Sequence, residues 1–187
     1  KFAVIGGGPS GLYFAILAKK RFPDADIQVY DQNPKGATFG FGIILADRGL
    51  GRMQKADAQS CDAIMKECYM TRNQLICHRG KEVLVERDAF GGAISRLDLL
   101  NVLEQQCAQL GIPVHYQTRI DDINRFDDCD LVVGADGVNS AVRETKKEAF
   151  GTTRWNLTNR MAWYGTTQHF AQPILNFKQT QYGHFWV

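Results

Sequence analysis

The sequence predicts an α/β protein: a Rossmann-like domain with a parallel sheet, followed by the start of a second domain built on an antiparallel sheet. The first domain is predicted because the chain passes twice from a short apolar strand through a glycine turn into a helix, at residues 2–21 and 130–145. After the first passage a second strand follows within about 30 residues, the length of a right-handed βαβ unit with parallel strands. The second domain is predicted because helix signals stop near Gly151, where aromatic and polar residues begin to alternate.

Composition restricts the class of protein. Of the 187 residues, 44% are apolar and 22% charged, as in a globular domain, and the net charge is only +2. The chain contains no basic block and no apolar run of about 18 residues, so neither nucleic acid nor a membrane is expected as a partner. The N-terminal apolar stretch leads into a glycine turn rather than a cleavage site, and the five cysteines form no CxxC pair. A cytoplasmic location with reduced thiols is therefore expected.

The first expected elements form the βαβ unit. Phe2–Ile5 is an apolar strand, and Pro9 opens a helix in which apolar residues recur at helical spacing. The helix is expected to end at Phe22, and Ile27–Asp31 is the second strand. Residues 34–52 are rich in glycine and are expected to form an ordered loop.

The middle of the chain is expected to contain two helices and a hairpin. A helix is predicted over Ala56–Met70, followed by hairpin strands at Leu75–Cys77 and Glu82–Val85. Ser95 is expected to cap the next helix, Leu97–Leu110, which has a regular apolar face. Two short strands are predicted after it, over Pro113–Tyr116 and Leu131–Ala135.

The domain boundary is predicted near residue 150. Residues 1–150 would form the first domain, although the hairpin near residues 75–87 could join the second sheet. Residues 151–187 would begin the second domain, with antiparallel strands in segments 160–170 and 174–187. The chain does not begin with methionine and stops inside the last of these segments, so it is expected to be truncated.

The first glycine turn predicts a dinucleotide site. Gly6, Gly8 and Gly11 fit G-x-G-x-x-G between a strand and a helix, and the acid Asp31 follows about 20 residues later, at the end of the next strand. Gly6 permits the tight turn, Gly8 lets the backbone approach a pyrophosphate, and Gly11 lets helix and strand pack closely. Asp31 can accept both hydrogen bonds of a ribose diol. The alternative is a glycine-rich turn in an α/β protein that binds no ligand.

No residue is identified as catalytic. The sequence contains no GxSxG elbow, no P-loop lysine and no HExxH pair. The four histidines lack the spacing of metal ligands, so no metal site is expected. They are His78, His115, His169 and His184.

Three motifs resemble, in their order along the chain, those of class A flavoprotein aromatic hydroxylases, which share the fold of para-hydroxybenzoate hydroxylase. They are "GGGPSGLYFAI" with Asp31, Arg96 at the head of "SRLDLLNVLEQQC", and "DLVVGADGVNSAVR". The segments "ATFGFGIILAD", "RDAFGGAISR" and "RMAWYGT" are similar to one branch of that family. This branch holds salicylyl-CoA 5-hydroxylase, 2-aminobenzoyl-CoA monooxygenase and the violacein-pathway tryptophan-derivative hydroxylase.

The resemblance implies that both glycine turns serve one FAD. The strand before Asp136 would lie beside the first strand, so that Asp136 and Gly137 face the pyrophosphate region and Asp136 also helps to handle NAD(P)H. The alternative is that Asp136 caps the helix that follows. Arg96 would approach the FAD phosphates, and the alternative is a solvated arginine, although the first turn of a helix disfavours a cation that has no anion nearby. The implied cofactor-binding residues are Gly6, Gly8, Pro9, Ser10, Gly11, Asp31, Gln32, Asn33, Gly42, Arg96, Asp136 and Gly137.

The implied reaction is hydroxylation of an activated aromatic substrate with NAD(P)H and O₂, through a flavin C4a-hydroperoxide. The substrate would be a small aromatic molecule, either an aryl-CoA thioester or a tryptophan derivative. The family's third motif, a Gly-Asp pair, would lie beyond Val187, so this fragment alone is expected to be inactive. Two alternatives stay open: another FAD-dependent oxidoreductase such as a reductase or halogenase, and a non-catalytic or degenerate module that binds FAD or NAD.

Overall fold

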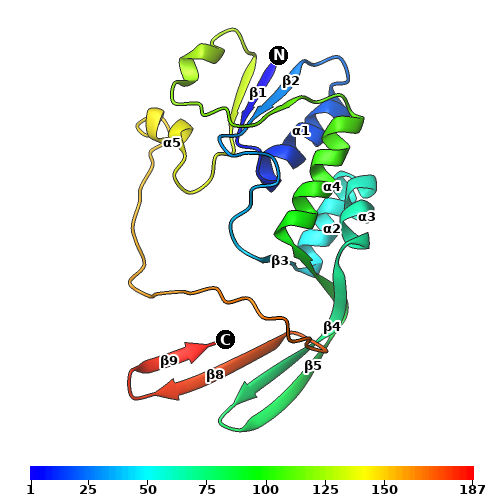
Figure 1. The fold of residues 1–187 in the computed structure, drawn as a ribbon, viewed down its shortest axis with the longest axis vertical. Coiled ribbons are helices and arrows are strands. Elements are labelled where there is room, and N and C mark those ends of the chain that lie inside the picture. Colours follow the sequence, from blue (N-terminus) through cyan, green and yellow to red (C-terminus); the bar gives the residue numbers. More distant parts are fainter.

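A computed structural model describes residues 1–187 as an α/β fold with two separate sheets (Figure 1). The strands are β1 (Phe2–Ile5), β2 (Ile27–Tyr30), β3 (Gly42–Leu45), β4 (Tyr69–His78), β5 (Lys81–Ser95), β6 (Val114–His115), β7 (Leu131–Gly134), β8 (Ile174–Thr180) and β9 (Gly183–Trp186). The helices are α1 (Pro9–Arg21), α2 (Asp47–Ala56), α3 (Ala58–Lys66), α4 (Arg96–Gln109), α5 (Ala141–Thr145) and the 3₁₀ helix η1 (Ile123–Phe126). The long β4–β5 hairpin connects the helical part to the lower sheet in Figure 1.

The upper sheet, sheet A, is entirely parallel and has the order β6-β2-β1-β7. Val4 of β1 lies between Val29 of β2 and Val133 of β7. The predicted βαβ unit is confirmed, and so is the expectation that the strand of the second glycine turn lies beside the first strand. This adjacency brings the two glycine turns together.

Both faces of sheet A are covered. Alternate side chains of a strand point to opposite faces, so Val4 packs in the larger core with α1 and α4, whereas Ala3 and Ile5 pack on the other side with η1 and α5. Leu12 of α1 and Leu103 of α4 are fully buried in the larger core. The prediction for α4 is confirmed: it begins directly after Ser95, whose Oγ accepts a hydrogen bond of 3.0 Å from the backbone N–H of Asp98.

The prediction of one helix over Ala56–Met70 is wrong. Two helices, α2 and α3, meet at Asp57, whose backbone is extended with φ −160°. The Asp57 carboxylate accepts from Lys20 Nζ at 2.5 Å, a contact between helices that hydrophobic periodicity does not reveal. The predicted loop over residues 34–52 is also wrong in part, because it contains β3 and the start of α2.

The hairpin is located where it was predicted, but its strands are much longer. Polar residues such as Arg72 and Asn73 hide the alternation expected of a strand, and the pairing shifts by a bulge between Thr71 and Asn73. The predicted strands at residues 160–170 are absent, and the aromatic side chains of this segment are exposed instead of packed. The strands predicted in segment 174–187 are confirmed as β8 and β9.

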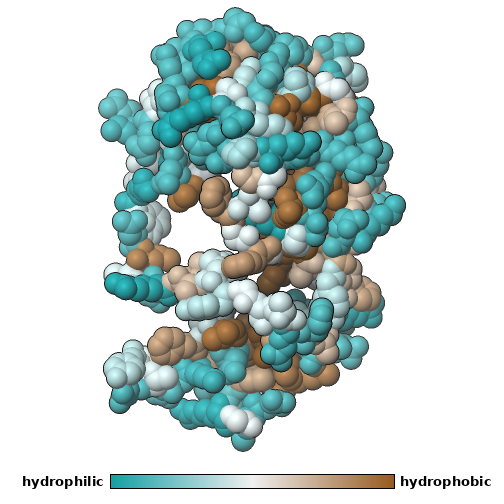
Figure 2. All heavy atoms as spheres, viewed as in Figure 1, coloured by the Kyte–Doolittle hydropathy of each residue, from teal (hydrophilic) through white to brown (hydrophobic).

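The lower sheet, sheet B, is mixed rather than antiparallel. Its order is β3-β5-β4-β8-β9, and β8 runs parallel to β4 while every other pair is antiparallel. The β4–β5 hairpin belongs to sheet B, while the division into domains, with a boundary near residue 150, stays a prediction. Figure 2 shows an opening between the upper part and sheet B, bounded by the connecting segment at residues 150–170. None of the helices has the length and apolar character needed to cross a membrane.

Candidate dinucleotide-binding site

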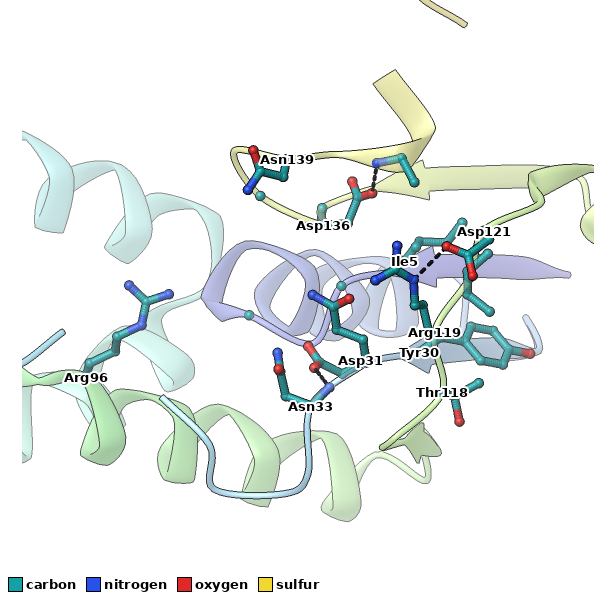
Figure 3. A pocket seen from close by; sticks show the side chains of 17 residues that line it. Ile5, Tyr30, Asp31, Asn33, Arg96, Thr118, Arg119, Asp121, Asp136 and Asn139 are labelled. Carbon is teal, nitrogen blue, oxygen red and sulfur yellow. Dashed lines mark hydrogen bonds and ion pairs between the residues drawn. The ribbon is translucent and has the colours of Figure 1, made fainter. Parts of the chain in front are cut away.

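A pocket of about 370 Å³ lies where the carboxyl ends of β1, β2 and β7 meet (Figure 3). Open parallel sheets bind ligands at this edge, because the loops after neighbouring strands converge there. The lining residues are Ile5, Gly6, Gly8, Tyr30, Asp31, Gln32, Asn33, Arg96, Thr118, Arg119, Ile120, Asp121, Ala135, Asp136, Gly137, Asn139 and Ala141. In the close-up, Asp31 and Asn33 approach from the segment after β2, and Asp136 and Asn139 from the second glycine turn.

The first glycine turn is shaped by its neighbours. Gly6 has φ +110°, and a Cβ at this position would lie 2.3 Å from the carbonyl oxygen of Ala135. A Cβ at Gly11 would lie 1.9 Å from the carbonyl oxygen of Gly6, so strand and helix touch backbone to backbone. Only glycine fits at either position. Gly6 and Gly11 therefore allow segments of the chain to approach each other closely.

Gly8 differs because a Cβ there would have no atom within 4 Å. It lines the pocket and is the residue before α1, and no side chain caps that helix. The N-terminus of α1, with its partial positive charge, therefore begins beside the pocket, an arrangement that suits an anionic group.

Asp31 is fixed by two hydrogen bonds at the end of β2. One carboxylate oxygen accepts from the backbone N–H of Gly7 and the other from that of Asn33, each at 2.7 Å. A carboxylate has about four acceptor positions, so both oxygens keep further capacity toward the pocket. Burial raises the pKa of neighbouring Tyr30, which keeps its hydroxyl protonated.

The two carboxylate oxygens of Asp136 have different surroundings. Its Oδ2 accepts from the backbone N–H of Ala141 at 2.6 Å and of Val142 at 3.3 Å, so the helix-capping alternative is correct for this oxygen. Its Oδ1 is buried and has no hydrogen-bond partner. Buried acceptors are normally satisfied, and an unsatisfied one at a pocket wall calls for a ligand or a bound water.

Arg96 also has a buried polar atom without a hydrogen-bond partner. It is the first residue of α4, its backbone N–H donates to the carbonyl oxygen of Phe41 at 3.0 Å, and its Nε is buried without a partner. Figure 3 shows its side chain reaching toward the pocket from the head of α4. A guanidinium at the positive end of a helix dipole is stabilised by an anion placed against it.

The structure brings together eight of the twelve predicted cofactor-binding residues in this pocket. Pro9, Ser10 and Gly11 belong to α1 but do not line it, and Gly42 lies in β3, opposite Ser95. Their proposed contacts with a cofactor stay predictions.

The sequence patterns did not reveal the part of the pocket wall that is formed by the segment after β6. Thr118, Arg119 and Asp121 line the pocket there, and Arg119 Nε forms an ion pair of 2.6 Å with Asp121 Oδ1. Asn139 was missed in the second turn. A usable signal existed, because the segment after the predicted strand at Pro113–Tyr116 must emerge at the same sheet edge as Asp31. No group of three or more His, Cys, Asp or Glu side chains in the fold is placed to hold a metal ion.

Comparison with protein families supports the Rossmann assignment. Residues 4–37 match the model of an NAD(P)-binding Rossmann-like domain. This segment holds most of the βαβ unit, the three glycines and Asp31.

Three curated proteins are similar over most of the chain. Salicyloyl-CoA 5-hydroxylase of a Streptomyces species is 34% identical, over 91% of this chain and 33% of its own length. The 3-hydroxy-4-methyl-anthranilyl-[aryl-carrier protein] 5-monooxygenase of Streptosporangium sibiricum is 30% identical, over 88% of the chain and 46% of its length. Protodeoxyviolaceinate monooxygenase of Chromobacterium violaceum is 27% identical, over 95% and 48%. The chain thus spans between a third and a half of these relatives, and the resemblance to their branch is confirmed.

Solved structures confirm the fold. The tetrameric form of 2-methyl-3-hydroxypyridine-5-carboxylic acid oxygenase superimposes with a TM-score of 0.67 and 22% identity, over 77% of this chain and 41% of that one. Pseudomonas aeruginosa PqsL in complex with 2-aminobenzoylacetate gives a TM-score of 0.64 and 16% identity, over 87% and 48%. The predicted α/β class with a Rossmann-like sheet is therefore confirmed.

Proposed function

Because the chain is homologous to hydroxylases and monooxygenases of aromatic substrates, we propose that it is the cofactor-binding part of an FAD-dependent aromatic monooxygenase. The reductant would be NAD(P)H and the co-substrate O₂. The organic substrate is an activated aromatic ring, either carried as an aryl thioester or derived from tryptophan. The names of the first two relatives favour the thioester.

The observation that carries the proposal is the meeting of two glycine turns around one pocket. A single Rossmann turn suits any dinucleotide, but here the second turn packs its backbone directly on Gly6 and adds an unsatisfied carboxylate oxygen, that of Asp136. The buried, unpartnered Nε of Arg96 supplies a cation on the third side. Together these groups suit a ligand that carries both phosphates and hydroxyls.

The residues present fit FAD. The N–H groups at Gly8 and the start of α1 would hold the diphosphate, Arg96 would neutralise part of its charge, and Asp31 would accept from the adenosine ribose. When bound, the flavin supplies electron transfer from NAD(P)H and the activation of O₂. The chain's own contribution is to position the cofactor and shield it, so the absence of an acid–base pair in the sequence agrees with this assignment.

The proposal is tested by the visible absorption spectrum of the purified protein after addition of FAD and removal of unbound cofactor. Retained flavin with its two oxidised bands is expected, together with a loss of affinity for Asp31→Ala and for Arg96→Ala. Asp24→Ala and Arg52→Ala are matched controls, because both residues are exposed and neither lines the pocket. Equal retention in all four variants would contradict the assigned site.

The non-catalytic alternative is separated by turnover. NAD(P)H oxidation that a ring substrate stimulates in the full-length protein is expected of a monooxygenase. A module that only binds FAD or NAD would retain flavin in the first experiment and show no such stimulation in the second.

A further inference from the structure

A second cleft, of about 610 Å³, lies far from the dinucleotide pocket, at the outer end of sheet B. It is lined by the tip of the β4–β5 hairpin and by the end of β8, two tips that lie near each other in Figure 1. The lining residues are Cys77, His78, Arg79, Gly80, Lys81, Glu82, Asn176, Phe177, Lys178, Gln179 and Thr180. Figure 2 shows mainly hydrophilic surface at this lower end.

Positive charge gathers in this cleft. Arg79, Lys81 and Lys178 face a single acid, Glu82, and none of the three cations forms an ion pair. Three unpaired cations around one hollow attract a multiply charged anion.

The hairpin turn adds an independent sign of function. Arg79 has φ +50° and Gly80 φ +73°, between the paired residues His78 and Lys81. Two consecutive left-handed residues make a type I′ turn, in which Asn-Gly is the favourable sequence and a long side chain is strained. Strain of this kind persists where the side chain has a task, and it points from the observed outlier to a hypothesis of function.

The strained arginine is aimed across the cleft. Its Nη2 donates to Oε1 of Gln179 on β8 at 3.1 Å, which ties the two tips together and holds the guanidinium between them. Lys178, next to Gln179, lines the same hollow. The cations thus come from two elements that only the tertiary fold brings together.

We propose that this cleft binds the phosphate end of a phosphopantetheine thioester, the carrier of the aromatic ring. The inference rests on the thioester substrate proposed above. Coenzyme A and acyl-carrier proteins both present an acyl group at the end of a phosphopantetheine arm, so the same cations serve either source. With its phosphate in the cleft, the arm would run along sheet B toward the opening beneath the dinucleotide pocket, where β3 and β5 pair.

Binding of coenzyme A to the flavin-loaded, full-length protein, measured by isothermal titration calorimetry, tests the proposal. Lys81→Ala and Lys178→Ala are each expected to weaken binding by up to about fivefold, the effect of removing one solvent-exposed ion pair. Added salt should weaken binding to the unaltered protein as well. Lys66→Ala, which removes an exposed lysine from α3, is the control and should bind normally.

Arg79→Asn separates a binding role from a structural one. Asparagine suits the left-handed turn better than arginine, so the midpoint of thermal unfolding should stay the same or rise. Coenzyme A should nevertheless bind up to about fivefold more weakly, because an exposed cation is lost. An arginine that served only the hairpin would leave binding unchanged.

Shorter probes identify which phosphate is held. Equal affinity for 4′-phosphopantetheine and coenzyme A would place the pantetheine phosphate in the cleft, as either source requires. Affinity for coenzyme A alone, weakened when the 3′-phosphate is removed, would place its nucleotide end there and favour a free thioester. Absence of binding to a flavin-loaded protein, or normal binding by all three cleft variants, would overturn the proposal while leaving the flavin assignment intact. Failure to retain flavin would count against the proposed function instead.

Discussion

Gly6 and Ala135 interlock the two glycine turns: a Cβ on Gly6 would lie 2.3 Å from the carbonyl oxygen of Ala135 and 2.7 Å from the backbone nitrogen of Asp136. These atoms belong to backbone and cannot move aside as a flexible side chain could. The fit between the turns therefore sets the shape of the pocket wall, and it can be tested through stability as well as through binding.

Gly6→Ala is expected to lower the free energy of unfolding by more than about 2 kcal/mol. The new methyl group would meet backbone, and φ +110° strains any residue that carries a Cβ. Urea denaturation followed by circular dichroism measures the change. An unaltered midpoint would show that the turns do not touch as described.

Gly8→Ala should behave in the opposite way. Its φ of −75° suits alanine and no atom lies within 4 Å of the added Cβ, so stability should change by less than about 0.5 kcal/mol. Affinity for FAD should fall by about tenfold or more, since a methyl group would occupy space that the pyrophosphate needs. Fluorescence titration with FAD measures this, and unchanged affinity would remove Gly8 from the site.

Asp136 can be divided into its two functions by substitution. Asp136→Ala removes the acceptor for the backbone N–H groups of Ala141 and Val142 at the start of α5 and should cost about 1 kcal/mol of stability. Asp136→Asn keeps an acceptor for the N–H of Ala141, so its stability should stay near that of the unaltered protein. It should still bind cofactor more weakly, because an amide replaces the unpartnered Oδ1. If Asp136→Asn bound the cofactor as tightly as the unaltered protein, the only role of Asp136 would be to cap α5.

Ser95→Ala is expected to destabilise the protein by about 1 kcal/mol, because Ser95 Oγ accepts from the first turn of α4. Ser95→Gly should cost only a few tenths of a kcal/mol, since glycine is a fair N-cap. Thermal unfolding of the pair measures the difference. Identical losses would show that packing, and not the cap, dominates at this position.

The contribution of Asp57 to the stability of the fold should depend on pH. Burial works against its charged form, but hydrogen bonds from Lys20 and Ser60 outweigh this effect and hold the pKa of Asp57 below its ordinary value. A lowered pKa in the folded state stabilises the fold above the unfolded value of about 3.9, and this stabilisation is lost as pH falls through the folded pKa.

Asp57→Asn should therefore lower the free energy of unfolding by about 1–3 kcal/mol at pH 7. The difference from the unaltered protein should shrink as pH falls below about 4. Urea denaturation at pH 7 and pH 3 measures it, with the exposed Asp24→Asn as control. A difference independent of pH would contradict the role of the charge.

Local patterns were sufficient to predict the Rossmann half. Phe2–Ile5 matches β1, and the capping signal at Ser95 located α4, because both depend on neighbours within a few residues. The turn at Asp136 was predicted to lie beside the first, and it does. These features are encoded by short-range spacing together with the geometry of parallel strands.

The remainder depends on contacts between distant segments. The break at Asp57 is stabilised by Lys20, 37 residues away, and the full length of β4 depends on pairing with β5 and β8. The pocket wall at Arg119 is defined by where β6 ends in the sheet, not by a motif of its own. Alternation of aromatic residues at 160–170 predicted strands that lack a partner strand in the fold.

The pairing of β1 with β7 also determines when the pocket can form during synthesis and folding. The first glycine turn is synthesised before Ala135 and Asp136, which complete its wall and follow only after the long intervening segment from α1 to β7. Such a contact between distant segments slows folding, because a long loop must close before the contact forms. On the ribosome, α1 and β2 can form first, yet the pocket cannot capture a nucleotide until β7 has emerged and inserted beside β1. If the proposed cofactor binds here, its loading follows the docking of β7, and nucleotide present at that moment would favour the docked strand over the open one.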